Sequence, residues 1–386
     1  MDFKTWFNLK GRDSFTIDPQ INPNDAQFYF GRPEKKAQLT MQVRKSFVDP
    51  GAPKIFIYGS YGSGKTQTLY HLAYYLQHEP PKSLKFKPAI VHVVLEMRSK
   101  SDHLDWHLQL VEALGKERVC RWVETLFNKT ENMEQSLTEL FGDYNLVNAI
   151  KNLRGGGEMP LLAWRWLAGH RLSPAELQRL QLTRNPGDTG AGEMVKLLVG
   201  FGHLAECNGE KLLFFMDEAE QFQNISNADA IESVHNYLRQ LADQKNSSVG
   251  FIMSFFALTD DEMPRSIWRG DIKNRVGVIN YIEIPPLPTV EDVSAFFKEL
   301  INTFIDQKAA EKKIQKDNLG VSLETYPLTA EAFNLLCDYA TRDPSQALPR
   351  NIIRAMNECA IAAWDEGKEV IDEAIVNDIA PLVFRQ

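Results

Sequence analysis

Five short apolar runs and several stretches of helical periodicity set the pattern of this chain. The runs lie at residues 54–58, 89–95, 212–216, 249–257 and 278–284. The second run is almost wholly apolar and rich in β-branched residues, which is typical of a parallel strand covered on both faces. After the first run, apolar residues recur at helical spacing from Leu69 to Leu76, so a helix follows it. We therefore expect an α/β fold with a five-stranded parallel sheet.

A long helical region separates the second and third predicted strands, over about residues 103–207. Helical segments are expected at 106–114, 119–127, 133–153, 161–167, 174–180 and 194–205. An ordinary crossover between parallel strands needs far fewer residues, so this region is an insertion, and insertions on a shared scaffold often carry partner specificity. The tryptophans on its apolar helical faces are expected in the core; they are Trp106, Trp122, Trp164 and Trp166.

The two ends of the chain differ from this central part. Residues 1–30 lack periodicity, and we expect an N-terminal arm that packs on its own or a neighbouring subunit, or else a loosely ordered terminus. From residue 287 to the end the pattern is helical, with breaks near Pro327 and Pro344. The predicted organisation is an arm (1–30), an α/β core (31–286) and a helical C-terminal domain (287–386).

Composition narrows the class of protein. A hydrophobic content of 44% without any apolar run long enough to cross a bilayer, and without a secretion signal, leads us to expect a cytoplasmic protein with no membrane contact. Four widely spaced cysteines argue against a zinc site. The formal net charge of −8 argues against a protein that coats nucleic acid, so any DNA contact must come from a local patch.

The first predicted strand leads into a phosphate-binding loop, Gly59-Ser60-Tyr61-Gly62-Ser63-Gly64-Lys65-Thr66. Its glycines let backbone N–H groups turn inward around phosphate oxygens, and the N-terminus of the next helix favours an anion. We expect Lys65 on the β- and γ-phosphates, Thr66 on Mg²⁺ and Thr68 in the same site. The loop predicts binding of ATP with Mg²⁺, against the alternative of a glycine-rich turn without a ligand.

The third predicted strand ends in Asp217-Glu218. A carboxylate at the end of a strand near the phosphate loop can hold Mg²⁺, and the next carboxylate can orient and polarise the attacking water. We assign Asp217 to Mg²⁺ and Glu218 to the role of general base. With both carboxylates present, we expect ATP hydrolysis.

Taken together, these motifs resemble those of the AAA+ ATPases, and within them the ORC-type initiator branch, over about residues 31–356. Phe30-Gly31-Arg32-Pro33-Glu34 resembles the family's N-terminal box beside the adenine, which implies that Arg32 helps to bind the nucleotide. The resemblance also implies that the helical C-terminal domain is a lid. It implies a polar sensor-1 residue near the end of the fourth strand, for which Ser254 and Thr259 are both candidates.

Two arginine-bearing stretches extend this resemblance. Asn274-Arg275-Val276-Gly277 resembles the stretch in which the family carries an arginine finger for a neighbouring subunit's ATP, with Arg269 as the alternative. Residues 347–354 resemble the start of the helix that carries sensor 2, which implies Arg350 on the γ-phosphate, with Arg354 as the alternative. A solvated surface arginine is the other interpretation in both places. The resemblance implies a homo-oligomer with composite ATP sites.

The inserted helices add a second resemblance. Residues 162–169, 172–177 and 212–220 are similar to an ATPase of bacterial phage-exclusion (BREX) clusters, and related TnsC-like ATPases regulate transposition as oligomers on DNA. This implies double-stranded DNA and an effector protein as partners. No room is expected after the lid for the winged helix of origin-licensing proteins. DNA contact would then come from basic clusters of the core or the insertion, namely Lys82, Lys85 and Lys87, Arg98 and Lys100, or Lys151 and Arg154.

Two other functions are considered. The main alternative is an ATP-dependent signalling or scaffold protein that controls a protein partner without contacting DNA. A third is a motor that threads polypeptides, but residues 96–99 lack the aromatic-apolar-glycine pore loop expected after the second strand.

Overall fold

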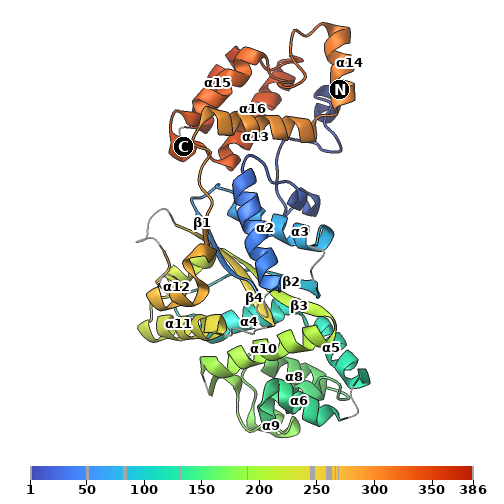
Figure 1. Cartoon of the computed structure of the whole chain (residues 1–386), viewed down its shortest axis with the longest axis vertical. Coiled ribbons are helices and arrows are strands. Elements are labelled where there is room, and N and C mark those ends of the chain that lie inside the picture. The colour runs from blue at the N-terminus through green and yellow to red at the C-terminus, as the bar shows by residue number, and fades with distance from the viewer. Residues whose placement is uncertain are drawn as a thin grey trace. The chain divides into compact units, whose positions relative to one another are not determined.

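The computed structural model describes residues 2–48, 52–80, 85–129, 132–188, 190–243, 248–257, 263–265, 267 and 269–384. The chain forms two compact units, whose elements are labelled in Figure 1. The first comprises Met1–Gln38, Gly59–His71 and Ile284–Gln386, and the second comprises Leu39–Tyr58 and Leu72–Glu283. The division thus cuts through two helices, α2 (Pro33–Val48) and α3 (Lys65–His78). It differs from the predicted boundaries, because the N-terminal residues and the phosphate loop group with the C-terminal helices.

A five-stranded sheet in the order β2-β3-β4-β1-β5 forms the centre of the second unit. The pairs with a described register are parallel, as in Phe214↔Phe251 and Phe56↔Tyr281. The sheet confirms the predicted α/β fold. The strands are β1 (Lys54–Gly59), β2 (Lys87–Val94), β3 (Glu210–Asp217), β4 (Val249–Phe256) and β5 (Tyr281–Glu283).

The fifth strand is shorter than predicted. Gly277 has a left-handed backbone (φ 87°), and Val278–Asn280 form a 3-10 turn, η5, instead of extended chain. The Asn280 side chain donates to the Val276 carbonyl at 2.6 Å, which closes this turn. Only the last residues of the apolar run therefore pair with β1.

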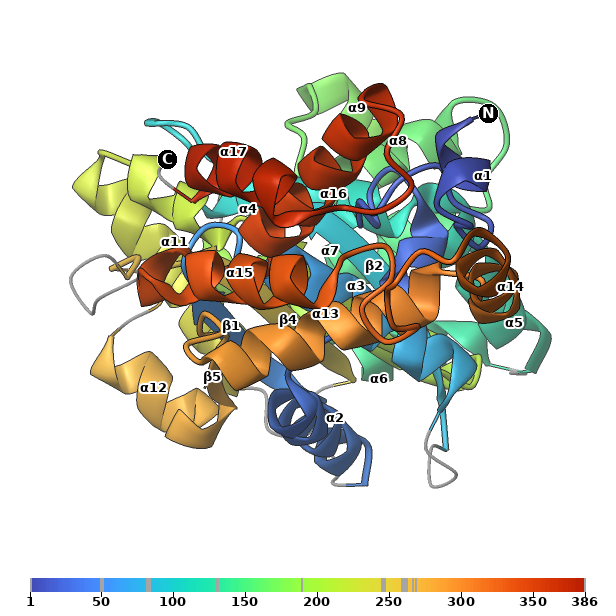
Figure 2. The same ribbon diagram turned by 90° about the horizontal axis from the view of Figure 1, so that it is seen from above.

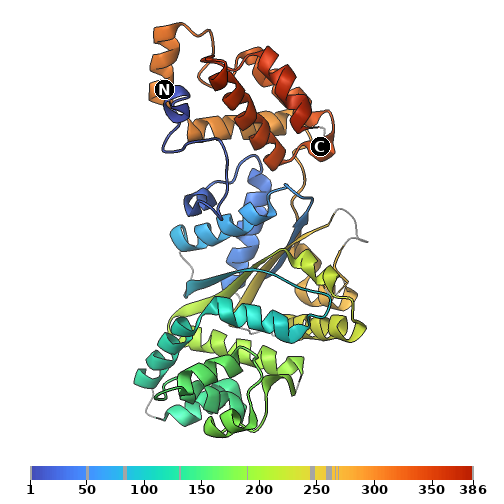
Figure 3. The same cartoon turned by 180° about the vertical axis from the view of Figure 1, so that it is seen from behind.

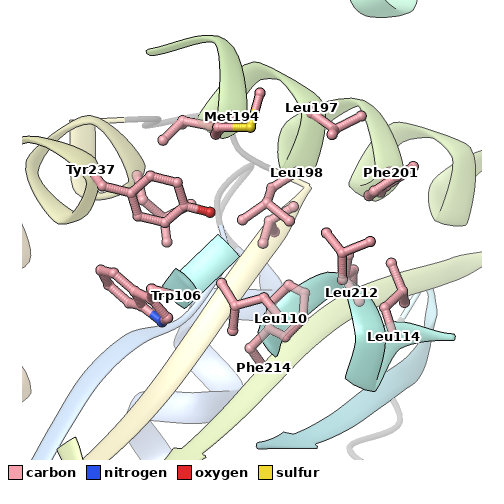
Figure 4. Close-up of a cluster of buried hydrophobic side chains, with 14 of the residues drawn as sticks. Trp106, Leu110, Leu114, Met194, Leu197, Leu198, Phe201, Leu212, Phe214 and Tyr237 are labelled. Atoms are coloured by element: carbon pink, nitrogen blue, oxygen red, sulfur yellow. The ribbon is translucent and has the colours of Figure 1, made fainter. Parts of the chain in front are cut away.

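Helices α4 (His103–Leu114), α10 (Ala191–Cys207) and α11 (Ala228–Asp243) pack on one face of the sheet. Figure 4 shows how their side chains meet those of β3. Trp106 of α4 and Tyr237 of α11 are fully buried, with ring centroids 4.9 Å apart. The core explains why β3 is apolar from Leu212 to Met216, since the strand lies inside the sheet and is covered.

The inserted region is helical, as predicted, and its helices appear in green in Figure 3. Between α4 and α10 lie α5 (Lys116–Lys129), α6 (Met133–Phe141), α7 (Tyr144–Asn152), α8 (Met159–Leu167) and α9 (Pro174–Arg179). Trp106, Trp122 and Trp166 are fully buried, and Trp164 packs partly buried against the same core, which confirms the prediction.

One predicted helix of the insertion is in fact two helices. The segment expected at 133–153 breaks after α6, where Gly142 takes the left-handed conformation (φ 64°) that ends a helix. Asp143 then caps α7, because its carboxylate accepts from the backbone N–H groups of Asn145 and Leu146. The apolar residues keep their helical spacing across Gly142 and Asp143, so the sequence pattern did not indicate this break.

The first unit contains the helical C-terminal region, which Figure 2 shows from above. Phe7, Leu9 and Phe15 from the N-terminus are buried in the core of these helices. The backbone N–H of Lys10 donates to the Phe304 carbonyl at 2.7 Å. The predicted N-terminal arm therefore packs on its own chain. The helices are α13 (Val290–Phe304), α14 (Gln307–Asp317), α15 (Ala330–Thr341), α16 (Pro349–Asp365) and α17 (Glu373–Val383).

Within the described part of the chain, no helix combines the length and apolar character that spanning a bilayer requires.

Candidate nucleotide-binding site

The phosphate loop joins the end of β1 to the start of α3, and its glycines are required by close approach and backbone conformation. A Cβ on Gly59 would lie 2.5 Å from the carbonyl oxygen of Ile284, closer than any side chain tolerates. Gly62 (φ 79°) and Gly64 (φ 97°) take conformations that L side chains rarely adopt. The loop therefore has the open, N–H-rich backbone that the sequence predicted.

Lys65 begins α3 and folds back over the loop. Its Nζ donates to the carbonyls of Gly59 (3.1 Å) and Ser60 (3.0 Å), and it lies 5.5 Å from the centre of the Tyr61 ring. The side chain is 9% exposed, so its charge is held inside the loop. Thr66 lies in the first turn and is half-buried.

Thr68 lies one turn along α3 and is fully buried. Its hydroxyl donates to the Gly64 carbonyl at 2.8 Å, so this proton is already used inside the helix. The structure therefore places Thr68 as a support of the loop's last residues.

Two hydroxyl groups of the loop test whether a polyanion fits it. Among the described residues, the buried Oγ atoms of Ser60 and Ser63 have no hydrogen-bond partner. Buried polar groups without partners are uncommon and costly, and such a group often marks a bound molecule. Together with Lys65 and the N-terminus of α3, these donors suit the phosphates of a nucleotide.

Arg32 binds the main chain of the phosphate loop. Its Nη1 donates to the Ser63 carbonyl at 2.6 Å, and its Nη2 donates to the Pro285 carbonyl just after β5. The residue is 8% exposed, and burial lowers the pKa of its guanidinium. The predicted nucleotide-binding residue thus holds the main chain of the loop.

The start of α16 lies against the same loop. The Arg350 backbone N–H donates to the Gly62 carbonyl at 3.3 Å, and a Cβ on Gly62 would meet the Arg350 side chain at 3.2 Å. Arg350 is exposed, as is Arg354 one turn later. The structure therefore brings Arg350 directly beside the phosphate loop.

Sequence reasoning missed the residues that tie the N-terminal segment to α3. Gln67 donates to the carbonyls of Asp25 (2.7 Å) and Phe28 (2.6 Å), and the His71 ring bonds the Ala26 carbonyl at 3.0 Å. Burial lowers the pKa of His71 to about 4. The available signal was weak: two polar residues four positions apart, on one face of an otherwise apolar helix.

In the second unit, Asp217 ends β3 and is 6% exposed. Its Oδ1 accepts from the Ser254 hydroxyl on β4 and from the backbone N–H of Glu218 (3.0 Å). Of the two sensor-1 candidates, Ser254 thus lies next to this carboxylate, whereas Thr259 lies outside the described residues. Glu218 is exposed and takes a left-handed backbone (φ 58°), a conformation uncommon for such a residue.

The sheet topology relates the loop to this carboxylate. β1 leads into the loop and β3 ends in Asp217, with only β4 between them in the sheet. Because the strands are parallel, both carboxyl ends lie at the same edge, which is where open α/β sheets bind ligands. Mg²⁺ takes oxygen ligands and keeps several waters, and a carboxylate such as that of Asp217 is a ligand type that suits it.

The two candidate finger arginines are both ion-paired. Arg275 near the end of α12 (Gly270–Val276) donates through Nε to Asp243 at 2.5 Å and through Nη1 to the Asp271 carbonyl at 2.9 Å. Arg269 donates to Glu232 at 2.8 Å. Each arginine is therefore held by an acidic residue of α11.

The basic residues considered for DNA contact differ in whether their side chains contact other residues of the chain. Lys151 pairs with Glu134 at 3.2 Å, and Arg154 lies 4.1 Å from the centre of the Phe127 ring. Arg98 and Lys100, in the loop after β2, are exposed. Lys85 and Lys87 are exposed too, and Lys82 lies outside the described residues.

The sequence matches no protein-family model and no curated protein sequence. Among solved structures, the ADP form of the Aeropyrum pernix ORC2 protein aligns with 97% of this chain and 73% of its own, at 12% identity and a TM-score of 0.50. The A. pernix ORC1 protein in complex with DNA aligns with 95% of this chain and 69% of its own, at 12% identity and a TM-score of 0.47. The chain thus has the predicted α/β fold with a five-stranded parallel sheet, and it shares this fold with ORC2.

Proposed function

We propose that this protein binds and hydrolyses ATP, assembles with ATP into a homo-oligomer, and acts on double-stranded DNA or recruits an effector protein to it. The observation that carries the proposal is that two strands of one parallel sheet each lead into residues suited to a nucleotide. A phosphate loop with Lys65 and two orphaned hydroxyls follows β1, and a buried carboxylate ends β3. The ADP bound by ORC2, which has the same fold, supports a nucleotide as the ligand.

In this proposal each residue of the site has a separate role. Lys65 exchanges the loop carbonyls for β- and γ-phosphate oxygens, and the Ser60 and Ser63 hydroxyls gain the partners that they lack. Asp217 and Thr66 would hold Mg²⁺, which would neutralise phosphate charge. Glu218, exposed at the strand end, takes the proton of the attacking water.

Arg275 is proposed to serve the neighbouring subunit's ATP. It precedes the amino end of β5, and its partner Asp243 follows Ala242, whose carbonyl accepts from Lys54 at the start of β1 at 2.6 Å. The phosphate loop follows the opposite end of β1, six residues and roughly 17 Å away. An arginine side chain does not span that length, which supports a role in a neighbouring subunit's site.

The surface beside Arg275 supports an interface with a second copy. Val278 and Ile279 follow it in η5, and they are 75% and 58% exposed. Adjacent exposed apolar residues of this kind commonly mark a contact with another protein. Arg350 is proposed to sense the γ-phosphate through its place beside Gly62.

The DNA-directed part of the proposal rests on Arg98 and Lys100, repeated around an oligomer, and on the resemblance of the inserted helices to phage-defence and transposition ATPases. The effector partner is proposed to bind the insertion. If low-salt double-stranded DNA changes neither the ATPase rate nor the oligomer size, the DNA role is wrong and the signalling or scaffold function takes its place.

The ATPase function is tested with two substitutions in the site. Lys65→Ala should abolish ATP binding, measured with a fluorescent ATP analogue. Glu218→Gln should keep that binding and lower kcat about 10²- to 10⁴-fold, because it removes only the proton acceptor. Lys87→Ala, an exposed lysine at the start of β2, is the control and should change neither. Wild-type binding by Lys65→Ala would contradict the assigned site.

The role of Arg275 is tested by mixing inactive subunits. Arg275→Ala and Lys65→Ala proteins are each expected to lose activity alone. When mixed, they should recover part of the wild-type ATPase rate, because one supplies the intact loop and the other the intact arginine. No recovery at any ratio would count against action between subunits.

A further inference from the structure

Four residues at the junction of α11 and α12 form a connected polar cluster within the second unit. Arg275 bonds Asp243 and the Asp271 carbonyl, and the Asp271 carboxylate is 3.0 Å from His235 Nε2. The His235 side chain is 4% exposed, whereas that of Arg275 is 31% exposed. The cluster thus joins a buried anchor on α11 to an accessible arginine on α12.

The donors that Arg275 uses in this cluster are the donors that phosphate recognition requires. A guanidinium has five N–H donors in a fixed plane, and it binds carboxylate and phosphate with the same geometry. With Nε on Asp243 and Nη1 on the Asp271 carbonyl, each of the two bidentate edges, Nε–Nη2 and Nη1–Nη2, has one donor occupied. Bidentate binding of a phosphate through the Nε–Nη2 edge therefore requires Arg275 to leave Asp243.

We propose that Asp243 and Asp271 are a latch that holds Arg275 against its own subunit until a nucleotide-loaded neighbour takes it over. The inference rests on the proposed role of Arg275 in a neighbour's ATP site, and it adds how that role is regulated. Asp243 competes directly with the neighbour's phosphate for the guanidinium. Asp271, whose carboxylate is fixed by buried His235, accepts from Nη1 of the same guanidinium through its backbone carbonyl.

The strength of the Asp243–Arg275 pair suits a contact that must open. The Asp243 side chain is 47% exposed, and ion pairs at this exposure contribute only weakly to stability. A latch of this strength delays assembly at low protein concentration without preventing it. The expected shift in the assembly midpoint on its removal is about two- to fivefold.

The pair formed by Arg269 and Glu232 provides a matched control. It joins the same two parts of the chain, because Glu232 lies on α11 and Arg269 directly precedes α12. Its two side chains are 2.8 Å apart and are also partly exposed. Removing this pair changes the charge of α11 by the same amount as removing the latch, but it leaves Arg275 held.

The experiment measures ATPase rate against the concentration of full-length protein and records the half-maximal concentration. Asp243→Asn should lower it about two- to fivefold, and Glu232→Gln should leave it unchanged. Asp243→Glu, which keeps a carboxylate, should behave like the wild type. Because Arg275→Ala is expected to lose ATPase activity, the double variant is compared with Arg275→Ala by oligomer size in the presence of ATP. Asp243→Asn should have no effect there, because there is nothing left to release.

The possible failures can be told apart. If Arg275→Ala alone retains the wild-type rate, the role of Arg275 in trans is wrong and the latch fails with it. If Arg275→Ala loses activity but Asp243→Asn leaves the midpoint unchanged, the latch alone is wrong. An equal shift by Glu232→Gln and Asp243→Asn, or a change in oligomer size when Asp243→Asn is added to Arg275→Ala, would also overturn it. Thermal unfolding of Asp243→Asn checks that the variant is folded.

Discussion

The hydroxyl of Ser254 and the backbone N–H of Glu218 both donate to Oδ1 of Asp217, the carboxylate proposed to hold Mg²⁺. We expect Ser254→Ala to raise the Mg²⁺ concentration for half-maximal ATPase activity about tenfold, because losing a residue that orients a metal ligand typically costs 10–100-fold. A magnesium titration at saturating ATP measures the effect. Ser248→Ala is the control: Ser248 is buried directly before β4, but its hydroxyl contacts His203.

At the scale of single residues, the sequence predicted a binding group where the residues that form it are close together in the chain. The loop from Gly59 to Thr66 could be identified because its glycines and lysine form one contiguous pattern. The contact between Ser254 and Asp217 needed the strand register, which pairs Met216 with Met253 and so brings Ser254 beside Asp217. The part that Arg32 takes in holding the Ser63 carbonyl could not be predicted, because that bond spans 31 positions.

At the scale of elements, Gly142 separates α6 from α7. A Cβ there would meet nothing within 4 Å, so Gly142→Ala tests backbone conformation alone. We expect a loss of about 1 kcal/mol in the free energy of unfolding, measured by urea denaturation, since the left-handed conformation is unfavourable for alanine. Gly156→Ala also has open space but no positive φ, and it should be close to neutral. Equal losses in both variants would contradict this explanation.

The same break shows why element boundaries were harder to predict than elements. All five strands were found from apolar runs, yet the run at 278–284 gave only three residues of strand because Gly277 and the Asn280 side chain turn the chain first. A side chain that bonds its own backbone competes with regular structure, and an apolar pattern does not record that competition.

At the scale of the whole molecule, each unit contains a buried histidine that stays neutral. Burial lowers the pKa of His71 in the first unit and His107 in the second to about 4, from an ordinary 6.5. As pH falls below 6.5 the unfolded chain takes up these protons and the folded chain does not, so stability present above pH 6.5 is lost towards pH 4. We expect each of these histidines to lower the free energy of unfolding by about 2 kcal/mol between pH 7 and pH 5.

Urea denaturation at the two pH values measures this loss. His71→Gln and His107→Gln should each reduce it by about 2 kcal/mol, whatever the stability of the variant at pH 7. His78→Gln, at an exposed position on α3, should leave it unchanged. A pH dependence that persists in the double variant would assign it to other groups.

The grouping of residues 59–71 with both ends of the chain has a consequence for biosynthesis. A ribosome makes the phosphate loop early, but the helices that complete its unit emerge last. Domains generally fold as units while synthesis proceeds. The sheet and its inserted helices can therefore fold on the nascent chain, whereas the loop gains its contact with Arg350 only after the final helices are released. A chain truncated before the C-terminal helices would contain the whole phosphate loop but not the helices that pack against it.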